Sequence, residues 1–220
     1  MRTLRVLVVV SFATLVSAAP KPHVVGLGSP QPVKLYVGPS EDKVIDVTVR
    51  ALYVDTKLKE YTSGKTHDVT DRTFVVRRAF RVNDALPDDS RKSSKWVWQL
   101  GGWLLVDRSS GKITQLKLPD FDAFYSDVSW YRDYAAYCGT TGNSEHLLAI
   151  VAQLGVKKPL YRKELGKASS GDLPDSDCAA PHWERKPARV TFLPKAGEKF
   201  TVNVSGHVAD MASELSAEEQ

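Results

Sequence analysis

Residues 147–152 read Leu147-Leu148-Ala149-Ile150-Val151-Ala152, a run in which all six side chains are apolar. A second continuous apolar run is Trp103-Leu104-Leu105-Val106. A strand with one solvated face alternates apolar and polar residues, whereas a strand covered on both faces reads as unbroken apolar sequence. We therefore expect both runs to form central strands of a sheet system that has layers on each side.

Three further segments, 45–50, 73–82 and 200–205, alternate apolar and polar residues with a period of two. This alternation predicts strands with one face toward water, and in 73–82 it places Arg77 and Arg81 on the polar face. Turn-forming residues lie between these segments, and no long apolar stripe of helical period occurs between Lys34 and His207. The sequence therefore predicts an all-β, antiparallel fold.

A faint internal repeat relates the stretch 96–118 to the stretch 134–165, with Trp103 and Leu147 in equivalent places 44 residues apart. This spacing is close to that of β-propeller blades, and residues 128–137 resemble the inner two strands of such a blade. The resemblance covers about residues 95–165 and implies no functional residues. We expect blade-like antiparallel meanders, as in a small propeller, with a β-sandwich or a partly open barrel as the alternative.

The amino-terminal residues predict export from the cytoplasm. Arg2 and Arg5 precede an apolar run, and small residues follow it, which is the pattern of a secretory signal peptide. We place the cleavage after Ala18, giving a signal peptide at 1–18 and a secreted or periplasmic mature chain. The sequence then divides into a Pro- and Gly-rich linker at 19–33, a β-rich domain at 34–208 and an acidic tail at 209–220.

The charge of the chain limits its partners. The net charge is +4, and removal of the signal peptide takes away two arginines, so the mature chain is nearly neutral. Binding to a phosphate backbone requires a much larger basic excess, so no nucleic-acid partner is predicted. No later segment is apolar for long enough to be a transmembrane helix.

The chain has two cysteines, Cys138 on a predicted strand and Cys178 in a long polar segment. Exported proteins tend to oxidise such a pair when the geometry allows it. We predict a Cys138–Cys178 disulfide, with two buried free thiols as the alternative.

The motifs of several enzyme classes are missing. The sequence has no Gly-x-Ser-x-Gly elbow, no phosphate loop, no dinucleotide fingerprint and no zinc spacing, so we predict neither a cofactor nor a metal. The remaining acid–base candidates are the pair Asp120 and Asp122 and the segment from Asp172 to Glu184, which includes Asp175, Asp177 and His182. Turn formation at the surface explains these residues, and a hydrolase that uses them is the rival hypothesis.

Aromatic residues are the strongest candidates for binding. Trp96 and Trp98 are two residues apart, so they project from one face of a strand, and Trp130 and Trp183 lie in the same half of the chain. Exposed aromatic rings bind proteins and stack on sugars, but packing in a core selects the same residues, so both interpretations stand. We expect a non-enzymatic exported domain that binds a protein or a glycan. A structural module that assembles with itself is a further alternative.

Overall fold

The computed structural model describes residues 22–36, 44–83, 96–123, 125–142, 145–168, 178–195 and 197–212, and every regular element in these ranges is a strand. The strands are β1 (Val25–Leu27), β2 (Gln31–Tyr36), β3 (Val44–Val54), β4 (Lys57–Asp68), β5 (Thr73–Asn83), β6 (Trp96–Asp107), β7 (Ile113–Gln115), β8 (Ser129–Tyr131), β9 (Tyr134–Thr140), β10 (His146–Gln153), β11 (Tyr161–Lys167), β12 (Cys178–Arg185), β13 (Ala188–Pro194), β14 (Phe200–Ser205) and β15 (Val208–Met211). The predicted all-β class is confirmed. The described ranges contain no helix that could cross a membrane.

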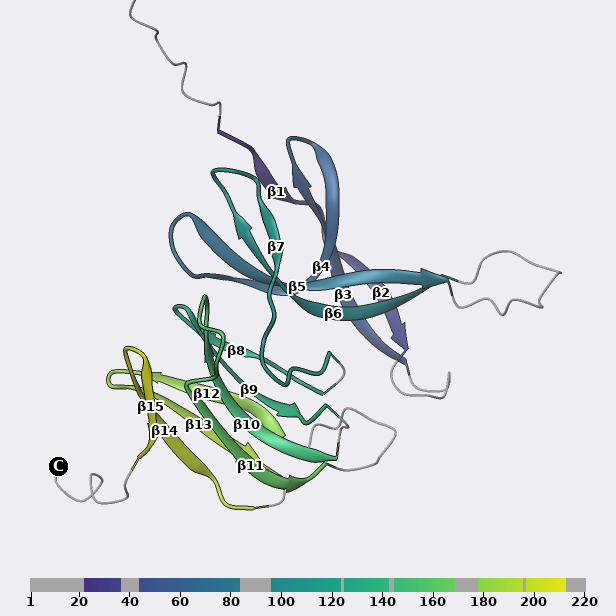
Figure 1. Cartoon of the computed structure of the whole chain (residues 1–220). Helices are drawn as coiled ribbons and strands as arrows, with labels where there is room; N and C mark the ends of the chain where they lie inside the picture. The colour runs from purple at the N-terminus through teal and green to yellow at the C-terminus, as the bar shows by residue number, and fades with distance from the viewer. Residues whose placement is uncertain are drawn as a thin grey trace, which may run out of the picture.

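The first sheet contains β1 to β7 in the order β1-β3-β2-β6-β5-β4, with β7 paired to β6. Strands β3 and β4 also pair, so the sheet curls back on itself (Figure 1). All of its pairs are antiparallel except β2 and β6, which meet in parallel at Leu35 and Trp98. The predicted antiparallel arrangement therefore has one parallel exception.

The second sheet (β8–β11) and the third sheet (β12–β15) are four-stranded antiparallel meanders in which sequential strands are neighbours. Residues of both sheets share one buried cluster, which includes Ala136 and Val151 from the second sheet and Phe192 and Val202 from the third. The two meanders thus face each other as the layers of a sandwich, in the lower half of Figure 1. The blade-like strand order was predicted, and sequential antiparallel pairing also runs from β3 to β7 of the first sheet. The sandwich alternative fits the second and third sheets, and a propeller is not confirmed.

Strand β10 is the central strand that its sequence predicted. Leu147, Ala149 and Val151 belong to the cluster shared with the third sheet. Leu148 and Ile150, which alternate with them, belong to a second cluster that includes Val75 and Trp103 of the first sheet. The second sheet therefore has a layer on each side, and its continuous apolar sequence follows from that double coverage.

Strand β6 is covered in the same way along residues 103–106. Trp103 and Leu105 pack toward the second sheet. Leu104 and Val106 pack into a cluster within the first sheet, together with Leu52 and other residues. Both continuous apolar runs are therefore strands buried on two faces.

The segment 19–33, predicted to be a linker, differs from that expectation. Its described part contains β1, which pairs with β3, and the first residues of β2. Val25 and Leu27 pack against the cluster around Leu52, and this burial outweighs the local preference of Pro and Gly for irregular chain. Strand β1 has only three residues and one strand partner. Its pairing therefore requires few backbone hydrogen bonds, which a segment rich in Pro and Gly can still provide.

The chain ends also bear on the predicted boundaries. The predicted tail at 209–220 begins inside β15, where Ala209 is buried against the sandwich core. The remainder of that tail beyond Ala212, and the predicted signal peptide at 1–18, lie outside the described residues.

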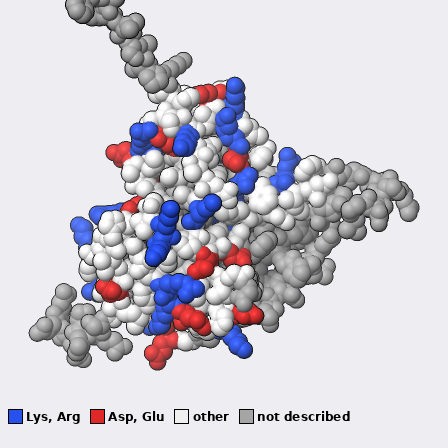
Figure 2. Space-filling view, viewed as in Figure 1, with Lys and Arg blue, Asp and Glu red and all other residues white. Residues whose placement is uncertain are grey.

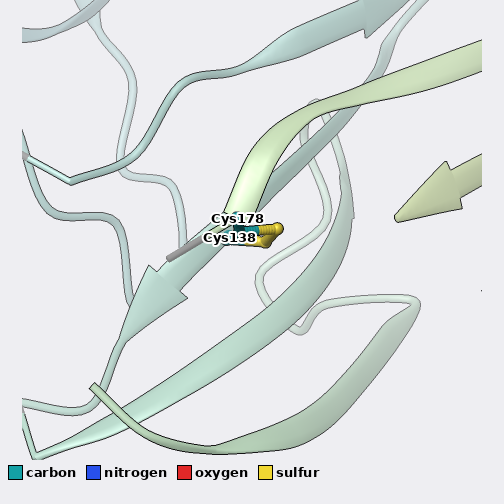
Figure 3. The surroundings of a disulfide bond; sticks show 2 residues. All are labelled: Cys138 and Cys178. Atoms are coloured by element: carbon teal, nitrogen blue, oxygen red, sulfur yellow. A yellow bond between two sulfur atoms is a disulfide. The ribbon is translucent and has the colours of Figure 1, made fainter. Parts of the chain in front are cut away.

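The predicted disulfide is present. It joins Cys138 on β9 to Cys178 at the start of β12, with 6.2 Å between their Cα atoms (Figure 3). Both residues are buried and belong to the sandwich core, so the bond links the second sheet to the third inside their common interface.

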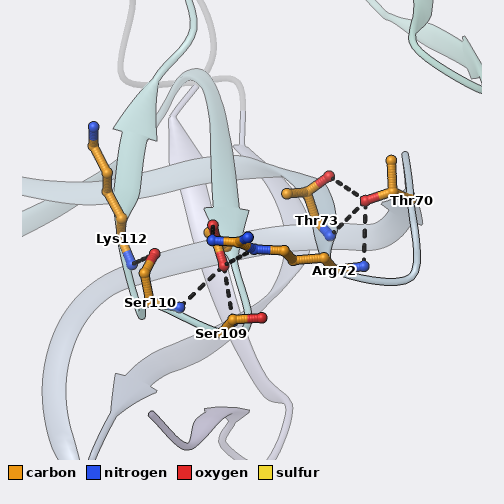
Figure 4. A network of polar contacts seen from close by, with 7 residues as sticks. Thr70, Arg72, Thr73, Ser109, Ser110 and Lys112 are labelled. Atoms are coloured by element: carbon orange, nitrogen blue, oxygen red, sulfur yellow. Dashed lines mark hydrogen bonds and ion pairs between the residues drawn. The ribbon is translucent and has the colours of Figure 1, made fainter. Parts of the chain in front are cut away.

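A polar network joins the start of β5 to the end of β6 (Figure 4). One carboxylate oxygen of Asp107 accepts hydrogen bonds from the backbone N–H groups of Ser109 and Ser110, at 2.8 and 3.0 Å. Arg72 donates from Nε to the same carboxylate at 3.0 Å and forms an ion pair with it at 2.7 Å. The hydrogen bond from Arg72 and those from the backbone hold the pKa of Asp107 well below its usual range.

Candidate functional site

A group of aromatic side chains surrounds Arg81 on the first sheet. Arg81 of β5 lies directly opposite Trp98 of β6 in the strand register, and Trp96 lies two residues from Trp98. The guanidinium carbon of Arg81 is 5.4 Å from the ring centre of Trp98 and 5.9 Å from those of Trp96 and Tyr61. We call Tyr61, Arg81, Trp96 and Trp98 together the Arg81 surface.

The rings of the Arg81 surface differ in exposure. Trp96 is 58% exposed, the largest exposure among the Trp, Tyr and Phe residues whose burial the structure describes. Trp98 is half-buried and makes an edge-to-face contact with Tyr61, with 5.1 Å between ring centres. Core packing therefore accounts for part of Trp98 but not for Trp96, and a binding role for these two residues stays a prediction.

Trp130, on β8, lies elsewhere. Its ring stacks on His67 at 6.1 Å and meets Trp103 edge to face at 5.3 Å. His67 is held in turn by a hydrogen bond of 2.8 Å between its Nε2 and the carbonyl oxygen of Arg132. Trp130 thus lines a cavity between the first sheet and the segment that precedes β8. The sequence named Trp130 without indicating this surrounding.

Trp183, on β12, is partly buried and packs against the sandwich core. Its indole N–H donates a hydrogen bond of 3.0 Å to the carbonyl oxygen of Ser129, and its ring lies beside those of Tyr131 and Tyr134. These contacts join the second and third sheets. They favour the packing interpretation of Trp183 over the binding one.

The candidate acid–base residues make structural contacts. Asp120 forms an ion pair of 3.0 Å with Arg162, and a carboxylate oxygen of Asp122 accepts a bond from the backbone N–H of Tyr125 at 3.3 Å. His182 is exposed on β12. Turn formation, the simpler interpretation, therefore fits both aspartates.

The rest of the acidic segment cannot be placed, because Asp172, Asp175 and Asp177 lie outside the described residues. Within the described ranges, no three His, Cys, Asp or Glu side chains come close enough together to hold a metal ion.

The sequence named two of the four residues of the Arg81 surface. It missed Tyr61 and Arg81, which the strand pairing brings beside the tryptophans. The alternation of the strand does place Arg81 on its polar face. The alternation does not reveal which strand pairs with it or in which register, so the neighbouring aromatic residues could not be predicted.

The face of the molecule seen in Figure 2 carries basic and acidic side chains interspersed over both halves. Comparisons of this chain with protein-family models, with curated proteins and with solved structures found no match.

Proposed function

We propose that this chain is an exported, non-enzymatic β-domain that binds a protein or a glycan through the Arg81 surface. The observation that carries the proposal is the exposure of Trp96 beside the guanidinium of Arg81, which also lies close to the rings of Trp98 and Tyr61. Trp, Tyr and Arg are the residue types that dominate the binding energy of protein interfaces. Aromatic rings also offer flat faces on which sugars stack.

The packing of the Arg81 surface favours binding in a second way. Arg81 lies within 6 Å of three ring centres, and Trp98 is fixed by its contact with Tyr61. Side chains that are already held in place lose little conformational freedom when a ligand covers them. The surface therefore combines exposed apolar area with a low entropic cost of binding.

Export is part of the same proposal. The disulfide between Cys138 and Cys178 is compatible with an oxidising compartment, where such bonds persist. Sequencing the amino terminus of protein recovered from outside the cytoplasm of the native host should begin at Ala19. An intact Met1 in the cytoplasmic fraction would contradict export.

Binding is tested by comparing Trp96→Ala with Leu193→Ala. Leu193 is a matched control, because it is 42% exposed on β13 of the third sheet and outside the Arg81 surface. The mature oxidised protein is immobilised and offered a glycan panel and extracts of envelope and surroundings, and any ligand captured is purified and its affinity measured. Trp96→Ala should weaken that affinity by about 5- to 150-fold, equivalent to about 1–3 kcal/mol.

The control and the stability measurement decide the outcome. Leu193→Ala should change the affinity less than about twofold, and Trp96→Ala should leave the thermal midpoint nearly unchanged because exposed side chains contribute little to stability. Equal affinities of Trp96→Ala and the parent protein would overturn the assignment of the site. Turnover of a polysaccharide, peptide or ester that depends on Asp120, Asp122 or His182 would overturn the non-enzymatic proposal.

A further inference from the structure

A cavity of about 770 Å³ lies between the first sheet and residues 123 and 125–130, apart from the Arg81 surface. We call it the Arg77 cavity. Its lining includes Lys65, His67, Arg77, Trp103, Asp127 and Trp130. The volume falls in the range of small-molecule sites in proteins.

Arg77 is a buried cation in the wall of this cavity. It is only 9% exposed, and its two terminal nitrogens donate to the carbonyl oxygens of Ser126 and Ala123, at 3.1 and 2.6 Å. Its guanidinium carbon lies 4.9 Å from the ring centre of Phe121 and 5.9 Å from that of Trp103. Arginine has five N–H donors, so these two bonds leave others for a ligand.

Among the described residues, no carboxylate forms an ion pair with Arg77, although Asp127 and Asp122 are near enough to favour its charged form. Burial outweighs these charges and lowers the pKa of Arg77 to about 10. Because these two carboxylates do not offset the cost of burying the guanidinium, a further anion beside it would be stabilising.

The charged side chains of the lining are mostly basic. Lys65 and Arg77 carry positive charge, and Asp127 is the one acidic side chain of the lining among the described residues. Lys65 has three N–H donors and no acceptor, and each terminal nitrogen of Arg77 carries a second N–H beyond the one that binds a backbone oxygen. Such a lining suits a ligand that carries acceptor oxygens and negative charge.

The apolar part of the wall defines the body of the ligand. Trp103 and Trp130 meet edge to face, and Tyr125 and Leu100 complete an apolar lining. Such a surface packs against a flat ring better than against a fully hydrated ion. From the buried cation, the donors and the aromatic wall together, we propose that the Arg77 cavity binds a small organic anion, a carboxylate carried on a flat ring.

Benzoate is the probe that tests this proposal, with benzyl alcohol as its neutral counterpart. Both are titrated into the mature oxidised protein while tryptophan fluorescence and the thermal midpoint are measured. Benzoate should give a saturable signal with a dissociation constant in the millimolar range or tighter, as expected for a ligand of this size, and benzyl alcohol should bind at least tenfold more weakly. Equal binding of the two, or no saturable effect of benzoate, would overturn the proposal.

Variants assign the signal to the cavity. Arg77→Gln should weaken benzoate binding at least tenfold, but Arg77 also binds the backbone of Ala123 and Ser126, and its loss can prevent folding. Asp127→Asn avoids this difficulty, because removing the acidic lining charge should strengthen benzoate binding two- to fivefold, a gain that misfolding cannot produce. Asp210→Asn, at an exposed acid of β15, is the control and should leave the affinity unchanged.

Two comparisons complete the test. If Asp127→Asn and Asp210→Asn bind benzoate equally well, the anion does not lie beside Arg77 and the proposal fails. Trp96→Ala should bind benzoate as the parent protein does, since Trp96 lies on the Arg81 surface and not in the lining of the cavity. The proposal for the Arg77 cavity and the proposal for the Arg81 surface can therefore be refuted independently of each other.

Discussion

Removing the disulfide should destabilise the chain by an amount that follows from the loop it closes. Cys138 and Cys178 are 40 residues apart in sequence. The chain-entropy relation gives a loss of about 13 cal/mol/K for a loop of this length, or about 4 kcal/mol at 25 °C. For a domain of about 200 residues, each kcal/mol shifts the thermal midpoint by about 2–4 °C, so the expected decrease is about 8–16 °C.

The assay compares the oxidised protein, the reduced protein and the variant with both cysteines replaced by alanine. Thermal unfolding is followed by circular dichroism, and alkylation with mass spectrometry verifies the state of the thiols. Reduction isolates the effect of the cross-link, whereas the double alanine variant also removes two buried sulfur atoms and should unfold at the same temperature or lower. Reductant should have no effect on the double variant, which is the control.

The result that would refute this reasoning is a fully reduced protein whose midpoint lies within about 2 °C of the oxidised one. The two sandwich layers would then hold each other in register without the cross-link. The loss of loop entropy would not be the quantity that the bond contributes.

Two further predictions follow from close contacts. Gly139→Ala should destabilise the protein by about 1–3 kcal/mol in urea unfolding, because a Cβ atom at this position would lie only 2.1 Å from the backbone oxygen of Asp120; a change below about 0.5 kcal/mol would contradict this close approach. Asp107→Asn should lower the thermal midpoint at pH 7 and have less effect at pH 2. The pKa of Asp107 is lower in the folded chain than in the unfolded chain. The ionised carboxylate therefore contributes its full stabilisation above the unfolded pKa of about 3.9 and loses it progressively as the pH falls below that value. An equal difference between variant and parent at both pH values would refute the second prediction.

The central strands could be predicted because a strand that is covered on both faces has apolar residues at every position. In β10, odd-numbered residues face the third sheet and even-numbered residues face the first, so an apolar side chain is needed at every position from Leu147 to Ala152. No partner has to be known for this inference, since period and polarity alone distinguish a strand with two covered faces from one with a wet face. The same argument predicts the central strand β6 from residues 103–106.

The amino-terminal strands could not be predicted from local composition. Pro and Gly between 19 and 33 are typical of a tether, and β1 and β2 form because β3 offers a pairing partner for each of them. A strand of three residues has too little periodicity to be recognised in sequence. Its stability comes from a partner about 27 residues away, where Val25 and Leu27 pair with Val54 and Leu52.

The disulfide could be predicted because the prediction required only the number of cysteines and the expectation of an oxidising compartment. Two cysteines in a chain expected to be exported admit one intramolecular pairing, so geometry did not need to be known. The tryptophans show the opposite case, because residue type is the same in a core and on a binding surface. Spacing placed Trp96 and Trp98 on one face, but only the described fold separates the exposed Trp96 from Trp183, which packs against the sandwich core.

Strand β5 shows why the Arg77 cavity could not be predicted from the sequence. Arg77 and Arg81 are four residues apart, so the strand period puts both on one face, and alternation predicts that both are solvated. Arg81 is exposed, but Arg77 is covered by Phe121, Ala123 and Ser126, and the carbonyl oxygens of Ala123 and Ser126 accept its hydrogen bonds. The alternation of one strand contains no information about residues more than 40 positions away that cover Arg77. Arg77 and Arg81 lie on the same face of β5, so this one strand supplies a guanidinium both to the Arg77 cavity and to the Arg81 surface.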